Sequence, residues 1–74
     1  MKRIILTTHV RQRMVERGIG LRHLRLAFAN PVAQLPARHN CLKLISLVKG
    51  RSLTVIFEQT EPETGVEITA YWSD

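Results

Sequence analysis

The spacing of apolar residues changes along the 74-residue chain, from a helical period near the N-terminus to alternation nearer the C-terminus. Ile4 and Leu6 alternate with their neighbours, which predicts a short strand. Behind it, Val10 and Met14 lie one helical turn apart and predict a helix that runs to about Arg17. Either of the two threonines between these segments can N-cap that helix with its hydroxyl.

Glycine and proline mark the end of this helix and the bounds of a second one. Gly18 can take the left-handed conformation that ends the first helix, and Ile19 can fold back as the hydrophobic contact after it. Gly20 is a tolerable N-cap for the next helix, which ends at Asn30 because a residue before proline is pushed out of the helical region. The apolar face of this second helix consists of Leu21, Leu24 and Phe28.

The remaining chain is predicted to be extended. Residues 32–36 form a weak edge strand or a loop. Stronger strands are predicted at residues 42–48, 52–58 and 66–72. The short turns between these three strands favour an antiparallel meander. The predicted fold class is α+β, with two N-terminal helices packed on one face of a three- to four-stranded antiparallel sheet, in one domain that covers residues 1–74.

Alternation assigns side chains to the two faces of this sheet. The side chains predicted to point toward the helices are Leu53, Val55, Phe57, Val66, Ile68, Ala70 and Trp72. Glu67, Thr69 and Tyr71 are predicted to point the other way. The strand at 42–48 does not alternate cleanly, which indicates either a bulge or a central strand covered on both sides.

Charge is segregated along the sequence. All eleven Lys and Arg residues lie at or before Arg51, where Glu16 is the one carboxylate, so this part carries about +10. Five of the six carboxylates follow, giving about −5. Such polarity favours an anionic partner, with nucleic acid as the first choice. The alternative is that the acidic part folds back and neutralises the basic part.

Composition narrows the class of protein further. Cys41 is the sole cysteine, so the chain can form neither an internal disulfide nor a thiolate zinc cluster, and it is best interpreted as a small buried hydrophobe. The three histidines, His9, His23 and His39, lack metal-ligand spacing, so we expect no metal and no cofactor. The N-terminal apolar run is too short for a signal peptide or a membrane span. We therefore expect a cytoplasmic protein with no membrane partner.

The residues best suited to chemistry lie on the first predicted helix. His9, Arg13 and Arg17 are spaced i, i+4, i+8 and form one ridge about 12 Å long. Guanidiniums bind phosphate as a planar fork, and an imidazole can move a proton near neutral pH. Together these groups suit a phosphodiester. The alternative is a solvated helix face on which Glu16 pairs with Arg13.

Several separated motifs resemble a small bacterial domain family of uncharacterised function. They are H-x3-R-x3-RGI from His9 to Ile19, an Asn-Pro after the second helix, GR-x-L-x-V from Gly50, and T-x-Y-W ending at Trp72. The order of elements is also similar, more distantly, to the BrnT and RelE-type toxins. This resemblance implies a metal-free ribonuclease toxin that acts on RNA and is neutralised by a cognate antitoxin protein.

Carried onto this sequence, the resemblance implies roles for individual residues. His9 or Tyr71 would take the proton from a ribose 2′-hydroxyl, while Arg13 and Arg17, with Arg51 as a further candidate, stabilise the negative charge on phosphorus. The predicted nucleic-acid-binding residues are Arg22, Arg25 and Arg51. A homodimer is also compatible with the chain.

Other interpretations remain open for the whole chain and for single residues. The protein could be a nucleic-acid- or protein-binding module without turnover, or a unit whose sheet edge at 32–36 accepts a partner strand. Tyr71 could be a cross-strand packing residue. Trp72 fits a core or interface position better than a base-stacking platform, because no second aromatic residue joins it at the required spacing.

Overall fold

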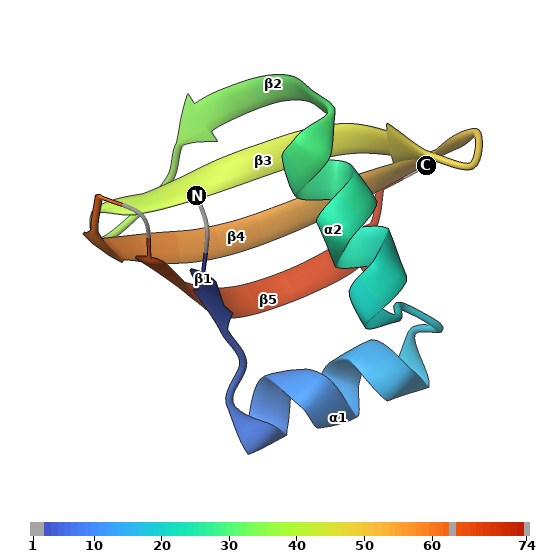
Figure 1. Ribbon diagram of the computed structural model, residues 1–74, viewed down its shortest axis with the longest axis horizontal. Coiled ribbons are helices and arrows are strands. Elements are labelled where there is room, and N and C mark those ends of the chain that lie inside the picture. The colour runs from blue at the N-terminus through green and yellow to red at the C-terminus, as the bar shows by residue number, and fades with distance from the viewer. Residues whose placement is uncertain (1–2, 63, 74) are drawn as a thin grey trace.

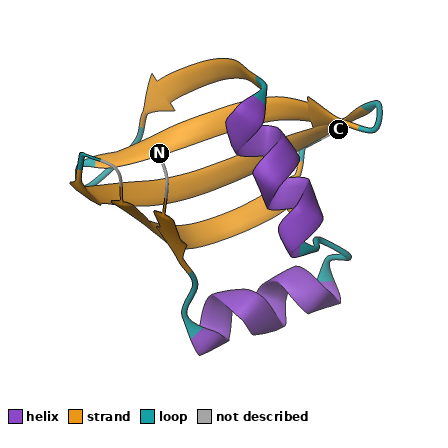
Figure 2. Ribbon diagram, in the orientation of Figure 1, coloured by secondary structure: helices purple, strands orange, loops and turns teal. Residues whose placement is uncertain are grey.

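A computed structural model describes residues 3–62 and 64–73 as two helices and a five-stranded sheet (Figures 1 and 2). The elements in chain order are β1 (Arg3–Ile5), α1 (Thr8–Glu16), α2 (Leu21–Ala29), β2 (Pro31–Pro36), β3 (Cys41–Val48), β4 (Arg51–Glu61) and β5 (Thr64–Trp72). The strand order is β1-β5-β4-β3-β2. Figure 1 shows α2 lying across one face of the sheet and α1 lying beside β5. The α+β class and the antiparallel β3-β4-β5 meander are confirmed.

The strand count and direction need one correction. The N-terminal segment pairs in parallel with β5, with Arg3 opposite Thr64 and Ile5 opposite Val66. The segment at 31–36 is an edge strand that pairs with β3. The sheet is therefore mixed and has five strands, because the short first strand joins it at the outer edge of β5.

The first helix begins and ends where the sequence predicts. The Thr7 hydroxyl accepts a hydrogen bond from the Val10 N–H at 3.2 Å, which makes Thr7 the N-cap. Gly18 has a φ of 69°, and the Ile19 N–H donates to the Met14 carbonyl at 2.8 Å, which is the Schellman arrangement. Val10, Met14 and Ile19 are all buried. The turn after α1 is thus closed both by backbone hydrogen bonds and by an apolar contact.

The second helix has the predicted bounds but a different apolar face. Gly20 is the N-cap and Asn30 the C-cap. Leu24 and Ala27 are buried, whereas Leu21 is 54% exposed, so the prediction for Leu21 is wrong. Leu21 lines a hollow beside α1 instead of packing in the core. Neither α1 nor α2 is long enough or apolar enough to cross a lipid bilayer, and the described residues contain no other helix.

Strand β3 lies between β2 and β4, in an unbroken register with β4. Its ambiguous alternation arises because apolar residues lie on both faces. Leu44 and Val48 are buried beneath the helices, while Leu47, on the opposite face, is 64% exposed. The irregularity falls instead in β2, between Pro31 and Ala33.

Strand β5 contains a bulge that overturns part of the predicted face assignment. Ile56 pairs with Thr69 but the next residue, Phe57, pairs with Glu67, which leaves Ile68 as the extra residue. Ala70 is buried as predicted, but Ile68 is 49% exposed. Val66 is half-buried. The bulge therefore turns Glu67 onto the helix-covered face and turns Ile68 away from it.

Glu67 is consequently a carboxyl group inside the core. The residue is 1% exposed, and neither carboxyl oxygen has a hydrogen-bond partner among the residues described. Burial without compensation disfavours the charged form, because the carboxylate loses its hydration. Desolvation raises the pKa of Glu67 from 4.5 to about 7. The fold therefore tolerates this residue best in its protonated form.

We expect stability to depend on pH through this one group. The raised pKa means that the folded chain holds the Glu67 proton more tightly than the unfolded chain. Its contribution to stability is complete below about pH 4.5 and is lost progressively up to about pH 7. Glu67→Gln removes the titration but keeps the shape, so at pH 8 it should raise the free energy of unfolding relative to the parent by on the order of 3 kcal/mol.

Urea unfolding at pH 5 and pH 8 measures this difference. Glu58→Gln is the matched control, because Glu58 is exposed on β4 and its substitution should leave the pH dependence unchanged. An identical pH dependence for Glu67→Gln and the parent protein would contradict the assignment.

Candidate functional site

The buried side of α1 separates its polar residues into two flanks. Val10 and Met14 face the core. Successive residues rotate by about 100° around a helix, so His9 and Arg13 lie on one flank and Arg11 on the other. All three polar residues are exposed. The predicted ridge therefore exists as a helix face, but it does not include every basic residue of α1.

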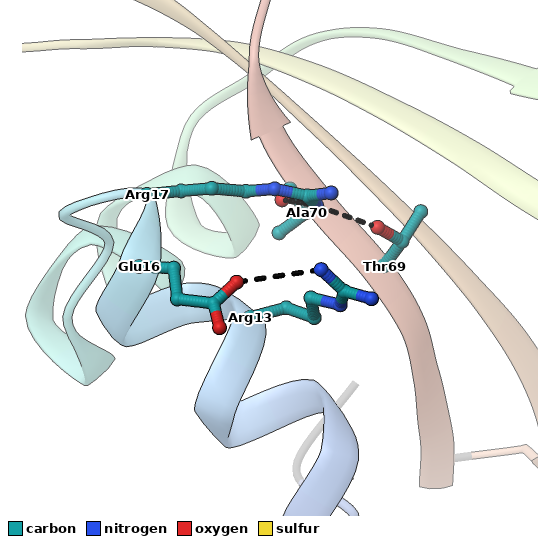
Figure 3. Close-up of polar contacts among 5 residues, drawn as sticks. All are labelled: Arg13, Glu16, Arg17, Thr69 and Ala70. Atoms are coloured by element: carbon teal, nitrogen blue, oxygen red, sulfur yellow. Dashed lines mark hydrogen bonds and ion pairs between the residues drawn. The ribbon is translucent and has the colours of Figure 1, made fainter.

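Arg17 is the best-anchored member of the predicted ridge. Its Nη1 donates to the Thr69 hydroxyl at 3.0 Å and to the Ala70 carbonyl at 2.9 Å (Figure 3). The Trp72 indole N–H donates in return to the Arg17 carbonyl at 2.9 Å. Among the described residues, β1 pairs with residues 64–66 of β5, so Arg17 binds the edge of β5 beyond that pairing. Arg17 thus has a structural role in addition to any chemical one.

Arg13 is held much more loosely. Its Nη1 lies 3.4 Å from the Glu16 carboxylate, and both side chains are 53% exposed. An exposed pair of this kind contributes little and is screened by salt. Figure 3 shows the Arg13 and Arg17 guanidiniums both extending from α1 toward β5. Two cationic groups therefore lie along the same stretch of that strand.

The two predicted proton acceptors lie toward opposite ends of this pair. His9 is the second residue of α1, eight positions and about 12 Å of helical rise before Arg17. Tyr71 is half-buried, pairs across the sheet with Thr54, and lies two residues beyond the Thr69 that Arg17 contacts. Tyr71 thus follows the stretch of β5 that Arg17 contacts, and His9 lies at the opposite end of α1. The two predicted proton acceptors come from different elements.

A second cluster gathers where β5 ends, and the sequence did not predict it. The Arg51 guanidinium carbon lies 4.2 Å from the centre of the Trp72 ring, and the His23 ring meets Trp72 edge-on at 5.4 Å. His23 is oriented by its Nδ1, which accepts the Gly20 N–H at 2.9 Å. Trp72 also packs against the core. Gly20 is the N-cap of α2 and His23 is its third helical residue, and a polar side chain at that position can accept the N-cap N–H. This spacing was the signal in the sequence from which the orientation of the His23 ring could have been predicted.

The other predicted nucleic-acid-binding residues do not join the His9 flank. With Leu24 turned to the core, Arg22 lies on the outer side of α2 and Arg25 on the flank that lines the hollow beside α1. Arg11 lines the same hollow. The basic residues therefore form separate surfaces, because each short helix presents its arginines on different sides.

The remaining candidate groups do not assemble into a further reactive centre. Cys41 is half-buried, and its thiol contacts the His39 carbonyl at 3.7 Å. Within residues 3–62 and 64–73, no three His, Cys, Asp or Glu side chains are placed to hold a metal ion. The groups of the predicted catalytic residues are two guanidiniums, an imidazole and a phenol.

A solved structure has the same arrangement of helices and strands. The structure is similar over its whole length to the crystal structure of the Brucella abortus ribonuclease toxin BrnT, with a TM-score of 0.75. The alignment covers 100% of this chain and 99% of BrnT, at 19% sequence identity, and it shows a shared fold. The sequence matches no protein-family model and no curated protein.

Arg17 and Arg13 should differ in their effect on stability. Arg17→Ala removes two hydrogen bonds to β5, so we expect the free energy of unfolding to fall by about 1–2 kcal/mol. Arg13→Ala breaks only an exposed pair and should change stability by less than about 0.5 kcal/mol. Urea unfolding of the two variants side by side measures the difference. An equal decrease in the free energy of unfolding for both variants would show that the hydrogen bonds from Arg17 to β5 do not stabilise the fold more than the exposed Arg13–Glu16 pair does.

Proposed function

We propose that the protein is a ribonuclease toxin that cleaves RNA on the α1 flank formed by His9, Arg13 and Arg17. The observation that carries the proposal is the placement of two guanidiniums side by side along β5, with an imidazole on the same flank. The fold shared with a ribonuclease toxin supports the choice of reaction. RNA supplies both the phosphate that guanidiniums bind and the 2′-hydroxyl that serves as an internal nucleophile.

The proposed reaction is a transesterification within the RNA strand. His9 or Tyr71 accepts the 2′-hydroxyl proton while the 2′-oxygen attacks phosphorus, forming a cyclic 2′,3′-phosphate and releasing the 5′-oxygen, which takes up a proton. Arg13 stabilises the added negative charge on the phosphate oxygens. Arg17 contributes through the N–H groups that β5 does not use, since its described contacts with Thr69 and Ala70 both involve Nη1. The reaction as proposed needs no metal.

A toxin of this kind requires control, so we also propose a cognate antitoxin protein as a partner and the cytoplasm as the site of action. Both proposals rest on the resemblance to the toxin class. A chain with a net charge of +5 is suited to both partners, because RNA and acidic proteins are polyanions.

Cleavage of RNA by the purified protein tests this function directly. His9→Ala should reduce the cleavage rate by about 100-fold if His9 is the base, and Tyr71→Phe should do so if Tyr71 is. Arg13→Ala should reduce the rate by at least about tenfold through lost stabilisation of charge. Gel analysis of a 5′-labelled RNA, together with detection of the cyclic phosphate end, measures both the rate and the mechanism.

Arg38→Ala is the matched control for net charge, because Arg38 is exposed in the loop between β2 and β3. Induced expression of the parent in bacteria should arrest growth, and the variants that lose cleavage should relieve the arrest. RNA binding that is sensitive to salt but yields no cleavage would favour a binding module instead. Loss of cleavage with Arg17→Ala alone would not decide the matter, because that variant also loses contacts that hold α1 to β5.

A further inference from the structure

A groove runs between α1, α2 and the segment that follows β1, on the side of α1 away from His9 and Arg13. Its wider part has a volume of about 340 Å³, and a narrower part of about 170 Å³ continues it along α1. The two parts share Leu6, Arg11 and Leu21. The residues that line the wider part are Ile4, Leu6, Arg11, Leu21, Leu24 and Arg25. We call this surface the α1–α2 groove.

The groove combines an apolar surface with two cations that the described residues leave unpaired. Leu21 is 54% exposed, and Val15 at the narrower end is 79% exposed. The guanidiniums of Arg11 from α1 and Arg25 from α2 have no hydrogen bond or ion pair within residues 3–62 and 64–73. The lining residues include no carboxylate. A ligand for this surface must therefore offer both apolar groups and negative charge.

This chemistry selects one class of partner. A nucleic acid would use the guanidiniums but leave the leucines uncovered, and neither part of the groove is lined by an aromatic residue on which a base could stack. A helix with apolar residues on one face and carboxylates beside them satisfies both requirements. We propose that the α1–α2 groove binds an acidic amphipathic helix of a partner protein.

The helices of a second copy of this chain do not fit the description. Helix α2 carries Arg22 and Arg25 with no carboxylate, and α1 carries Glu16 against two arginines. Neither helix could place carboxylates beside both Arg11 and Arg25. The occupant is therefore a different protein, and the inference does not depend on RNA cleavage.

A synthetic peptide tests the proposal. The probe is a helical peptide of about fourteen residues, with leucines at i, i+3, i+4 and i+7 and glutamates beside them, and its matched control has lysine in place of every glutamate. Titration into the ¹⁵N-labelled full-length chain should give saturable NMR shifts at Leu6, Arg11, Leu21 and Arg25. The lysine peptide should bind at least about tenfold more weakly.

Charge reversal identifies the surface. Arg11→Glu and Arg25→Glu should each weaken peptide binding by at least about tenfold, whereas Arg38→Glu, with the same net charge, should leave it unchanged. His9→Ala should bind the peptide like the parent, even if it no longer cleaves RNA. Failure of the proposed ribonuclease activity would thus be seen separately from failure of this inference.

Four results of these binding experiments would overturn the inference. These are no NMR shifts at about 1 mM peptide, equal binding of the lysine peptide, shifts confined to the His9 and Arg13 flank, or a single-stranded RNA oligonucleotide that occupies the groove in preference to the peptide. Self-association through Leu21 and Arg25 would also overturn the inference, because it would assign the groove to a second copy of the chain. Sedimentation would detect it as a dimer of the parent protein that is absent in Arg25→Glu.

Discussion

The contact between the end of α1 and the edge of β5 positions the helix that carries His9, Arg13 and Arg17. Arg17 donates through its guanidinium to Thr69 and Ala70 and accepts through its carbonyl from Trp72. Hydrogen bonds from both its side chain and its backbone to one strand fix how far α1 lies along β5 and how it is rotated. The Schellman turn at Gly18 follows at once, so the same contact sets the start of α2. The two flanks of α1 face different surroundings as a result.

Local signals in the sequence were sufficient for the helices and for most of the sheet. Thr7, Gly18 and Pro31 act through hydroxyl capping, a left-handed backbone and the exclusion of a helical neighbour, and each of these effects involves only residues nearby in the chain. The meander followed from alternation and short turns. What the sequence could not show was the pairing of Arg3–Ile5 with β5, because nothing within three residues specifies which distant strand edge they join.

The candidate site was predictable in part for the same reason. The i, i+4, i+8 spacing places His9, Arg13 and Arg17 on one face of any helix. It does not say that Arg17 would be held by β5, because Thr69 lies 52 positions away in the sequence. Nor does it place Arg22 and Arg25 relative to that face, since the rotation of α2 against the sheet depends on tertiary packing of Leu24 and Ala27.

The bulge at Ile68 breaks the rule that apolar side chains are buried and charged ones exposed. It exposes an isoleucine and buries the carboxyl group of Glu67, which has no hydrogen-bond partner among the described residues. It lies between the part of β5 that pairs with β1 and the part that Arg17 contacts. A bulge bends and twists a strand, so β5 changes its edge partner from β1 to α1 at this position. Exceptions of this kind tend to lie at functional or strained sites. Here the bulge lies next to the residues of β5 that Arg17 contacts, on the side where the Arg13 and Arg17 guanidiniums lie. The same bulge that buries Glu67 at an energetic cost therefore also shapes the strand edge beside these two guanidiniums.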